Sequence, residues 1–139
     1  KRQSTDDAIF STPGVNIGLF CSTPMVALSR NVIRKKAMKM LLTGDPVSAK
    51  HAKDIGLIND HFSQDSLEDE VLKLAENISS KSRKVVKIGK KAFYKQIEMP
   101  LDKAYKYTSQ VMSENMMALD AKEGISAFIE KRKPNWKDK

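Results

Sequence analysis

The side chains best suited to chemistry are few and far apart in this sequence. Its two histidines, His51 and His61, and its single cysteine, Cys21, lack the short spacings that join the ligands of a zinc or iron site. His51 lies beside Lys50 and Lys53 on a polar segment, where a solvent-exposed imidazole is the ordinary outcome. We therefore expect no metal site and no catalytic histidine.

Motifs that activate a nucleophile or hold phosphates are also missing from the sequence. Gly14 and Gly18 lack the Lys-Ser/Thr pair of a phosphate-binding loop and the third glycine of a dinucleotide-binding loop. No Gly-x-Ser-x-Gly sequence, which would indicate a nucleophile elbow, occurs. A lone Cys21 excludes an internal disulfide, and we interpret it as a buried thiol in a reducing compartment.

Three carboxylates stand near predicted helix starts. Asp69 follows Ser66 at the spacing of a capping box, and Glu123 follows Asp120 in the same way. A carboxylate at such a position accepts from free backbone N–H groups and complements the helix dipole. We therefore interpret Asp69, Asp120 and Glu123 as helix caps rather than as acids or bases in catalysis.

Lysines recur at helical spacing in the second half of the chain. The stripe consists of Lys84, Lys87, Lys91 and Lys95. With a formal charge of +8, the chain attracts polyanions, and a coenzyme A (CoA) ester, a nucleic acid or an acidic membrane would each fit. Such a stripe is also typical of the solvated face of an amphipathic helix, so the charge alone does not identify a partner.

The first part of the chain predicts one strand and then short helices. Residues 8–11 are β-prone, and Pro13-Gly14 indicates a turn after them. Thr23-Pro24 is typical of a helix start, and the apolar spacing up to Gly44 predicts two short helices. Ser48 is placed to cap a further helix that ends at Gly56, and Leu57-Ile58 should be extended.

The second part predicts longer helices. We expect a helix after Ser66 and three further helices over residues 83–98, 100–118 and 121–133, with Pro134 ending the last. The helix over 83–98 carries an apolar stripe at Val86, Gly89, Phe93 and Ile97. The tail 135–139 is expected to fray.

Composition sets the outer limits. The chain has 139 residues, of which 40% are hydrophobic and 30% charged, as is typical of a folded soluble domain. Its longest apolar runs cover only a few residues, whereas a membrane-spanning helix needs about 20. The sequence begins without an initiator methionine or a recognisable leader, so we expect that its true start could lie upstream.

Three segments together resemble the enoyl-CoA hydratase/isomerase (crotonase) family. They are AIFSTPGVNIGL, KKAMKMLLTGDPVSAKHAKDIGLIND and DAKEGISAFIEKRKPNW. The likeness covers the chain from about residue 7 onward, and FSTPGVNIGLFCSTP with KAFYKQ is similar to one mitochondrial member. It implies an α/β crotonase-like fold: residues 1–60 as the last part of the β/α spiral, and 61–139 as a helical C-terminal region for oligomer contacts and CoA covering.

The resemblance also implies what chemistry this stretch lacks. Family members bind the thioester carbonyl in an oxyanion hole of two backbone N–H groups, and both donors lie upstream of the strand at 8–11. Hydratases add two glutamates; the first lies upstream, and the second falls at Gly14. Because glycine cannot transfer a proton, we expect no catalytic residue in this chain and doubt its hydratase activity.

What the resemblance retains is binding. Phe128 and Lys131 match family residues that cover the adenine and phosphates of CoA, and Val15, Ile17 and Leu19 are candidates for lining the acyl pocket. Each could instead be ordinary core or surface.

The implied ligand is acyl-CoA, with no cofactor, in fatty-acid and lipid metabolism in the mitochondrion, and with a homotrimer or hexamer as the assembly. No DNA partner is expected. The alternatives left open are an RNA-binding protein that uses the lysine stripe and a non-catalytic oligomerisation module.

Overall fold

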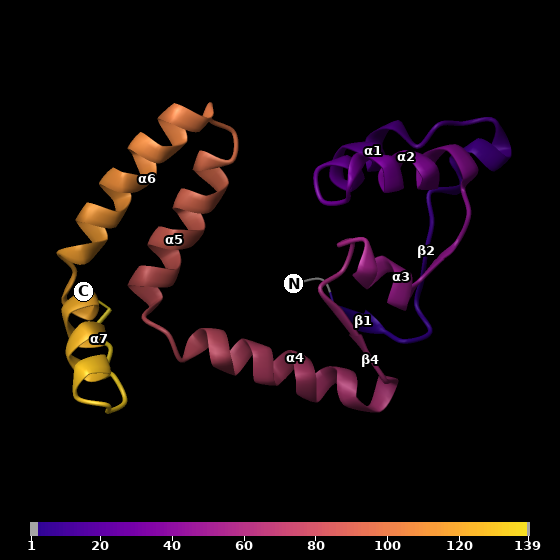
Figure 1. Cartoon of the computed structure of the whole chain (residues 1–139). Helices are drawn as coiled ribbons and strands as arrows, with labels where there is room; N and C mark the ends of the chain where they lie inside the picture. Colours follow the sequence, from indigo (N-terminus) through magenta and orange to yellow (C-terminus); the bar gives the residue numbers. More distant parts are fainter. Residues whose placement is uncertain (1–2, 139) are drawn as a thin grey trace. The chain divides into compact units, whose positions relative to one another are not determined.

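The computed structural model describes residues 3–138 and divides the chain into two compact units, residues 1–74 and 75–139. The division falls within helix α4 (Gln64–Ser79). Along the described residues the structure is mainly helical, with a few very short strands (Figure 1). The expected boundary between a spiral core and a helical region, after residue 60, stays a prediction.

Unit 1 holds two small strand pairs. Strand β1 (Gln3–Thr5) pairs in parallel with β4 (Asp60–Phe62), and β2 (Ile9–Phe10) pairs antiparallel with β3 (Val47–Ser48). The β2 strand confirms the extended segment expected over residues 8–11. The prediction that Leu57 and Ile58 form an extended segment is wrong. Both backbone N–H groups donate to the Ala52 carbonyl, so these residues form a bend at the end of the preceding helix.

The helices of unit 1 follow the sequence signals closely. They are the 3₁₀ helix η1 (Pro13–Ile17), α1 (Ser22–Ser29), α2 (Arg34–Thr43) and α3 (Ala49–Asp54). Gly44 ends α2 in the left-handed conformation, φ 67°, and Ser48 caps α3 by accepting from the His51 N–H, as predicted. Helix α1 starts slightly before Thr23-Pro24, which is tolerated because N–H groups of the first turn have no partner within the helix.

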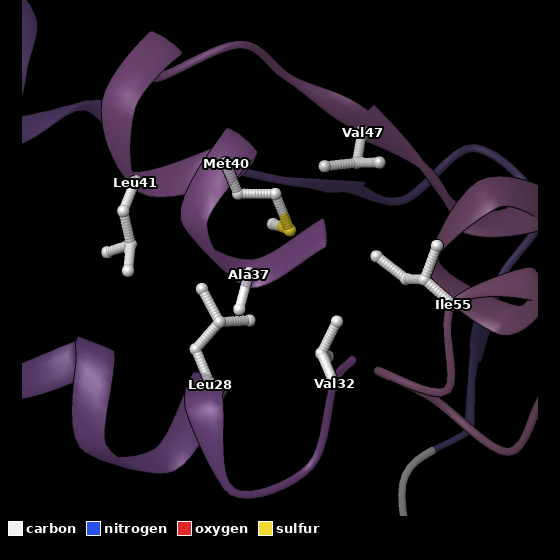
Figure 2. Close-up of a cluster of buried hydrophobic side chains, with 7 residues drawn as sticks. All are labelled: Leu28, Val32, Ala37, Met40, Leu41, Val47 and Ile55. Atoms are coloured by element: carbon white, nitrogen blue, oxygen red, sulfur yellow. The ribbon is translucent and has the colours of Figure 1, made fainter. Parts of the chain in front are cut away.

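Apolar side chains form the core of unit 1. Helices α1 and α2 pack side by side, and Figure 2 shows Leu28 and Val32 facing Ala37 and Met40. The whole cluster contains Leu28, Val32, Ala37, Met40, Leu41, Val47 and Ile55. A second small cluster consists of Ala49 and Ala52 on α3 and Ile58 in the segment that follows it. Burial of these side chains stabilises the unit that carries the predicted acyl-pocket loop.

Unit 2 contains the last part of α4, then α5 (Arg83–Gln96), α6 (Leu101–Met116) and α7 (Leu119–Ile129). Helices α5 and α6 run side by side, and each also contacts α7. Its buried apolar residues are alanines: Ala92, Ala104, Ala118 and Ala127. The apolar stripe predicted on α5 is exposed, because the small Ala92 side of that helix is the one that packs within the unit.

The predicted caps of α4 and α7 are wrong. Helix α4 starts at Gln64, so Ser66 lies in its first turn and Asp69 lies beyond that turn. The Ser66 hydroxyl is hydrogen-bonded to the Ser63 hydroxyl. Helix α7 starts at Leu119, and Asp120 and Glu123 accept hydrogen bonds from residues after the helix instead of capping it. No helix among residues 3–138 is long and apolar enough to cross a bilayer.

Candidate functional site

The loop expected beside the acyl pocket is a 3₁₀ turn with exposed apolar tips. The Leu19 N–H donates to the Gly14 carbonyl, and Gly18 leaves η1 with φ 75°. Val15 is half-buried, whereas Ile17 and Leu19 are 76% and 64% exposed. Two of the three candidate lining residues are therefore exposed, and their role in an acyl pocket stays a prediction.

Gly14 has no room for a side chain. Its N–H donates to the Cys21 sulfur at 3.3 Å, so the thiol lies directly against the glycine. A Cβ at position 14 would lie 2.8 Å from Cys21 Sγ and 2.8 Å from the Leu19 carbonyl oxygen. Cys21 is half-buried, whereas the sequence predicted a buried thiol. The resemblance located Gly14, but no sequence signal indicated that Cys21 occupies the space of a side chain there.

Unit 1 also contains a cavity of about 710 Å³ that the sequence did not indicate. Its walls come from β1, β2, α1, α2 and the segment after α3, and include Phe10, Leu28, Met40 and Ile58. Thr12 at its edge is buried and donates to the Met40 carbonyl at 2.9 Å. Val15, Ile17 and Leu19 are not among the residues that line it.

The two candidate CoA-covering residues lie at the end of α7 in unit 2. Phe128 is 85% exposed and, together with Ile125, borders an apolar cavity of about 600 Å³. Lys131 is exposed and follows the helix with φ 54°, a left-handed conformation that is uncommon outside glycine. Val15, Ile17 and Leu19 belong to unit 1, so each unit carries its own part of the predicted binding set.

Two carboxylates of α7 hold the C-terminal tail, which the sequence had indicated would fray. Asp120 is 1% exposed and accepts from the Ser82 hydroxyl and from the N–H groups of Lys137, at 2.7 Å, and Asp138, at 3.0 Å. The Ser82 hydroxyl and then the two N–H groups lower the pKa of Asp120, against the effect of burial. The Trp136 indole N–H donates to the Ser80 carbonyl at 2.8 Å.

Glu123 makes the second attachment of the tail. It receives both terminal nitrogens of Arg132, at 2.6 and 3.1 Å, and the Asn135 N–H at 2.7 Å. The Arg132 guanidinium and then the Asn135 N–H lower the pKa of Glu123 to about 2. These contacts join residues 9 and 12 positions apart, so helical periodicity could not reveal them.

The remaining candidates have ordinary surroundings. His61 contacts the Asp6 carboxylate through Nδ1, and His51 is exposed on α3. Of the lysine stripe, Lys87, Lys91 and Lys95 are exposed. The Lys95 ammonium lies 4.6 Å from the centre of the Tyr107 ring, a cation–π contact between α5 and α6.

The sequence matches one family model, described as enoyl-CoA hydratase/isomerase, over residues 3–139. Among curated relatives, it is 52% identical to enoyl-CoA hydratase domain-containing protein 3, mitochondrial, of Mus musculus, over 133 residues, covering 96% of this chain and 44% of that protein. It is 34% identical to the mitochondrial enoyl-CoA hydratase of Pongo abelii over 134 residues, covering 96% of this chain and 46% of that protein.

Solved structures give the same result. An enoyl-CoA hydratase of Mycobacterium smegmatis matches with a TM-score of 0.91 and 49% identity, covering 96% of this chain and 52% of that one. The human enoyl-CoA hydratase domain-containing protein 3 matches with a TM-score of 0.89 and 49% identity, covering 96% and 53%. The chain thus spans about half the length of the relatives it matches.

The comparisons confirm two predictions made from the sequence. The fold class is that of a fragment of the α/β crotonase-like fold, mainly helical with short strands. The narrower likeness carried by FSTPGVNIGLFCSTP and KAFYKQ is to enoyl-CoA hydratase domain-containing protein 3. Because the family model extends from residue 3 to residue 139, this chain belongs to the enoyl-CoA hydratase/isomerase family.

Proposed function

We propose that this chain serves in a protein that binds acyl-CoA esters without hydrating them. Membership of the enoyl-CoA hydratase/isomerase family supports the ligand class and a place in fatty-acid and lipid metabolism, and the names of its relatives support the mitochondrion as the location. The exposed Phe128 and Lys131 would contact the CoA adenine and phosphates, and the loop with Val15, Ile17 and Leu19 would approach the acyl chain. No cofactor is needed for binding of this kind.

The crowding at Gly14 is the observation that supports the absence of hydratase activity. Hydration of a double bond requires a carboxylate that can activate or protonate around a water molecule. At the position where the resemblance places the second glutamate, Cys21 and the Leu19 carbonyl occupy the volume of a Cβ. Even a methyl group therefore cannot enter without a shift of backbone, so the glycine is part of the local packing.

Direct binding tests the proposal. The purified chain is applied to immobilised CoA, and we expect retention that free CoA reverses and that falls about tenfold in affinity when Lys131 is replaced by alanine. Lys122 is an exposed cation on α7, so Lys122→Ala is the matched control and should bind as the wild type does. Retention that Lys131→Ala leaves unchanged would refute the assigned contact.

Activity is tested in the same preparation with crotonyl-CoA. We expect no hydration by the wild type and none by Gly14→Glu, because the inserted side chain would displace the loop instead of pointing at a substrate. Cys21→Ala combined with Gly14→Glu removes the sulfur but leaves the Leu19 carbonyl in place, so it should stay inactive as well. Turnover by the wild type would overturn the proposal.

RNA binding through α5 and a purely structural role in oligomers are distinguished by the same material. Retention on RNA that falls steeply with salt, without a response to CoA, would favour the lysine stripe as the binding surface. Assembly into a trimer or hexamer with neither ligand bound would favour the oligomerisation module.

A further inference from the structure

The turn that follows α7 places a lysine where glycine is normally found. The Lys131 N–H donates to the Phe128 carbonyl at 3.3 Å, and the Arg132 N–H donates to the Ala127 carbonyl at 3.0 Å. This pair of hydrogen bonds is the Schellman motif, in which the residue after the helix takes a left-handed conformation and is usually glycine. With φ 54°, Lys131 is strained, and strain of this kind persists only when surrounding contacts enforce it.

Arg132 supplies the enforcing contacts. Its terminal nitrogens bind both oxygens of Glu123 on α7, and its Nε donates to Glu130 at 2.5 Å. A planar guanidinium held by two carboxylates fixes its own position and direction more strictly than a single ion pair would. The residue after Lys131 is therefore attached to the body of the helix.

The chain beyond the turn is attached to the same carboxylate. The Asn135 N–H donates to Glu123 Oε1, which also accepts from Arg132. Glu123 therefore binds two residues that follow Lys131 in the chain. Lys131 itself makes no side-chain hydrogen bond or ion pair with residues 3–138, and its ammonium is exposed. The hydrogen bonds and ion pairs of this turn are therefore made by Arg132 and Asn135, and the Lys131 ammonium remains accessible to a ligand.

We propose that Glu123 and Arg132 are positioning residues, which hold Lys131 in its left-handed conformation and aim its ammonium at the phosphates of a CoA ligand. The inference rests on the proposed function, because it assigns a task to Lys131 there. Because Glu123 has a pKa of about 2, its carboxylate remains charged at any physiological pH and can accept from Arg132 and Asn135 throughout that range.

A double-mutant cycle with CoA tests the coupling. Glu123→Gln and Arg132→Lys each remove the bidentate pair, and we expect each to weaken CoA binding about three- to tenfold in the wild type but less than about twofold in a Lys131→Ala background. Glu70→Gln removes the exposed ion pair with Lys73 on α4 and is the matched control. It should leave the affinity for CoA unchanged in both the wild-type and the Lys131→Ala background. Equal losses in both backgrounds would mean general destabilisation and would overturn the proposal.

A ligand-free measurement separates this inference from the proposed function. A positive φ gives a strong intraresidue amide–Hα cross-peak in NMR, which we expect for Lys131 in the wild type and expect to weaken in Glu123→Gln and Arg132→Lys. If the wild type does not bind CoA, the proposed function fails while this signal still decides whether the pair holds Lys131. An unchanged Lys131 signal in both variants would overturn the positioning role.

Discussion

The two units of this chain are stabilised by different kinds of contact. Unit 1 buries branched and long apolar side chains, such as Leu28, Met40 and Leu41, between helices that touch directly. Unit 2 buries alanines together with Ser82 and Asp120, and its C-terminal tail is attached through carboxylates. The comparison shows that two carboxylates interpreted from the sequence as helix caps, Asp120 and Glu123, stabilise unit 2 as buried leucines stabilise unit 1.

The largest expected effect comes from the apolar core of unit 1. Leu41 is 1% exposed, so Leu41→Ala should lower the free energy of unfolding by about 2–5 kcal/mol through lost burial and the cavity left behind. Its neighbour Leu42 is 61% exposed and provides the matched control, since Leu42→Ala should cost far less. Urea unfolding followed by circular dichroism measures both. Equal losses would show that α2 does not bury the face seen here.

Asp120 should show the next largest effect, confined to unit 2. The Asp120→Asn substitution keeps the shape of the side chain, but an amide nitrogen replaces one oxygen and faces at least one donor now bonded to the carboxylate. We expect this variant to lower the urea midpoint less than Leu41→Ala does and to release the tail.

Trp136, the only tryptophan in the chain, reports that release directly. Its emission should shift to the red in Asp120→Asn and stay unchanged in Asp102→Asn, an exposed carboxylate of α6 in the same unit. An unshifted emission in Asp120→Asn would show that the tail is held without this carboxylate.

The tail also marks the limit of what the sequence revealed. Local signals placed the strand at Ile9–Phe10, the end of α2 at Gly44 and the cap at Ser48, because each depends on residues within one turn. The partners of Asp120 are Ser82, Lys137 and Asp138, which are 17 to 38 positions away. Helical periodicity carries no information on such pairs, so the spacing between Asp120 and Glu123 was interpreted as a helix cap.

The candidate site divides in the same way. The resemblance indicated Phe128, Lys131 and the glycine at position 14, since these depend on residue type at a matched place. It did not indicate that Cys21 fills the space beside Gly14, or that Lys131 is left-handed, because both are properties of packing and backbone.

Acid should weaken unit 2 through Glu123, with a smaller effect than removing Asp120. The pKa of Glu123 is about 2 in the folded chain against an ordinary value of 4.5, so its contribution is complete above pH 4.5 and is lost as the pH falls toward 2. Trp136 emission should therefore begin to shift within that window. The Glu123→Gln variant cannot titrate there and should show a smaller change across it. An identical change in both would assign the transition to other carboxylates.

The smallest expected effect has the opposite sign. Lys131→Gly should raise the free energy of unfolding by about 0.5–1 kcal/mol, because glycine adopts φ 54° without the steric penalty that a Cβ incurs, although it loses more entropy on folding. Lys133→Gly makes the same substitution two residues later, where φ is not positive, and should be destabilising. Thermal unfolding measures both variants. A gain in stability with a loss of CoA retention would mean that the lysine is kept for binding at the expense of stability, whereas a destabilised Lys131→Gly would show that the turn does not strain it.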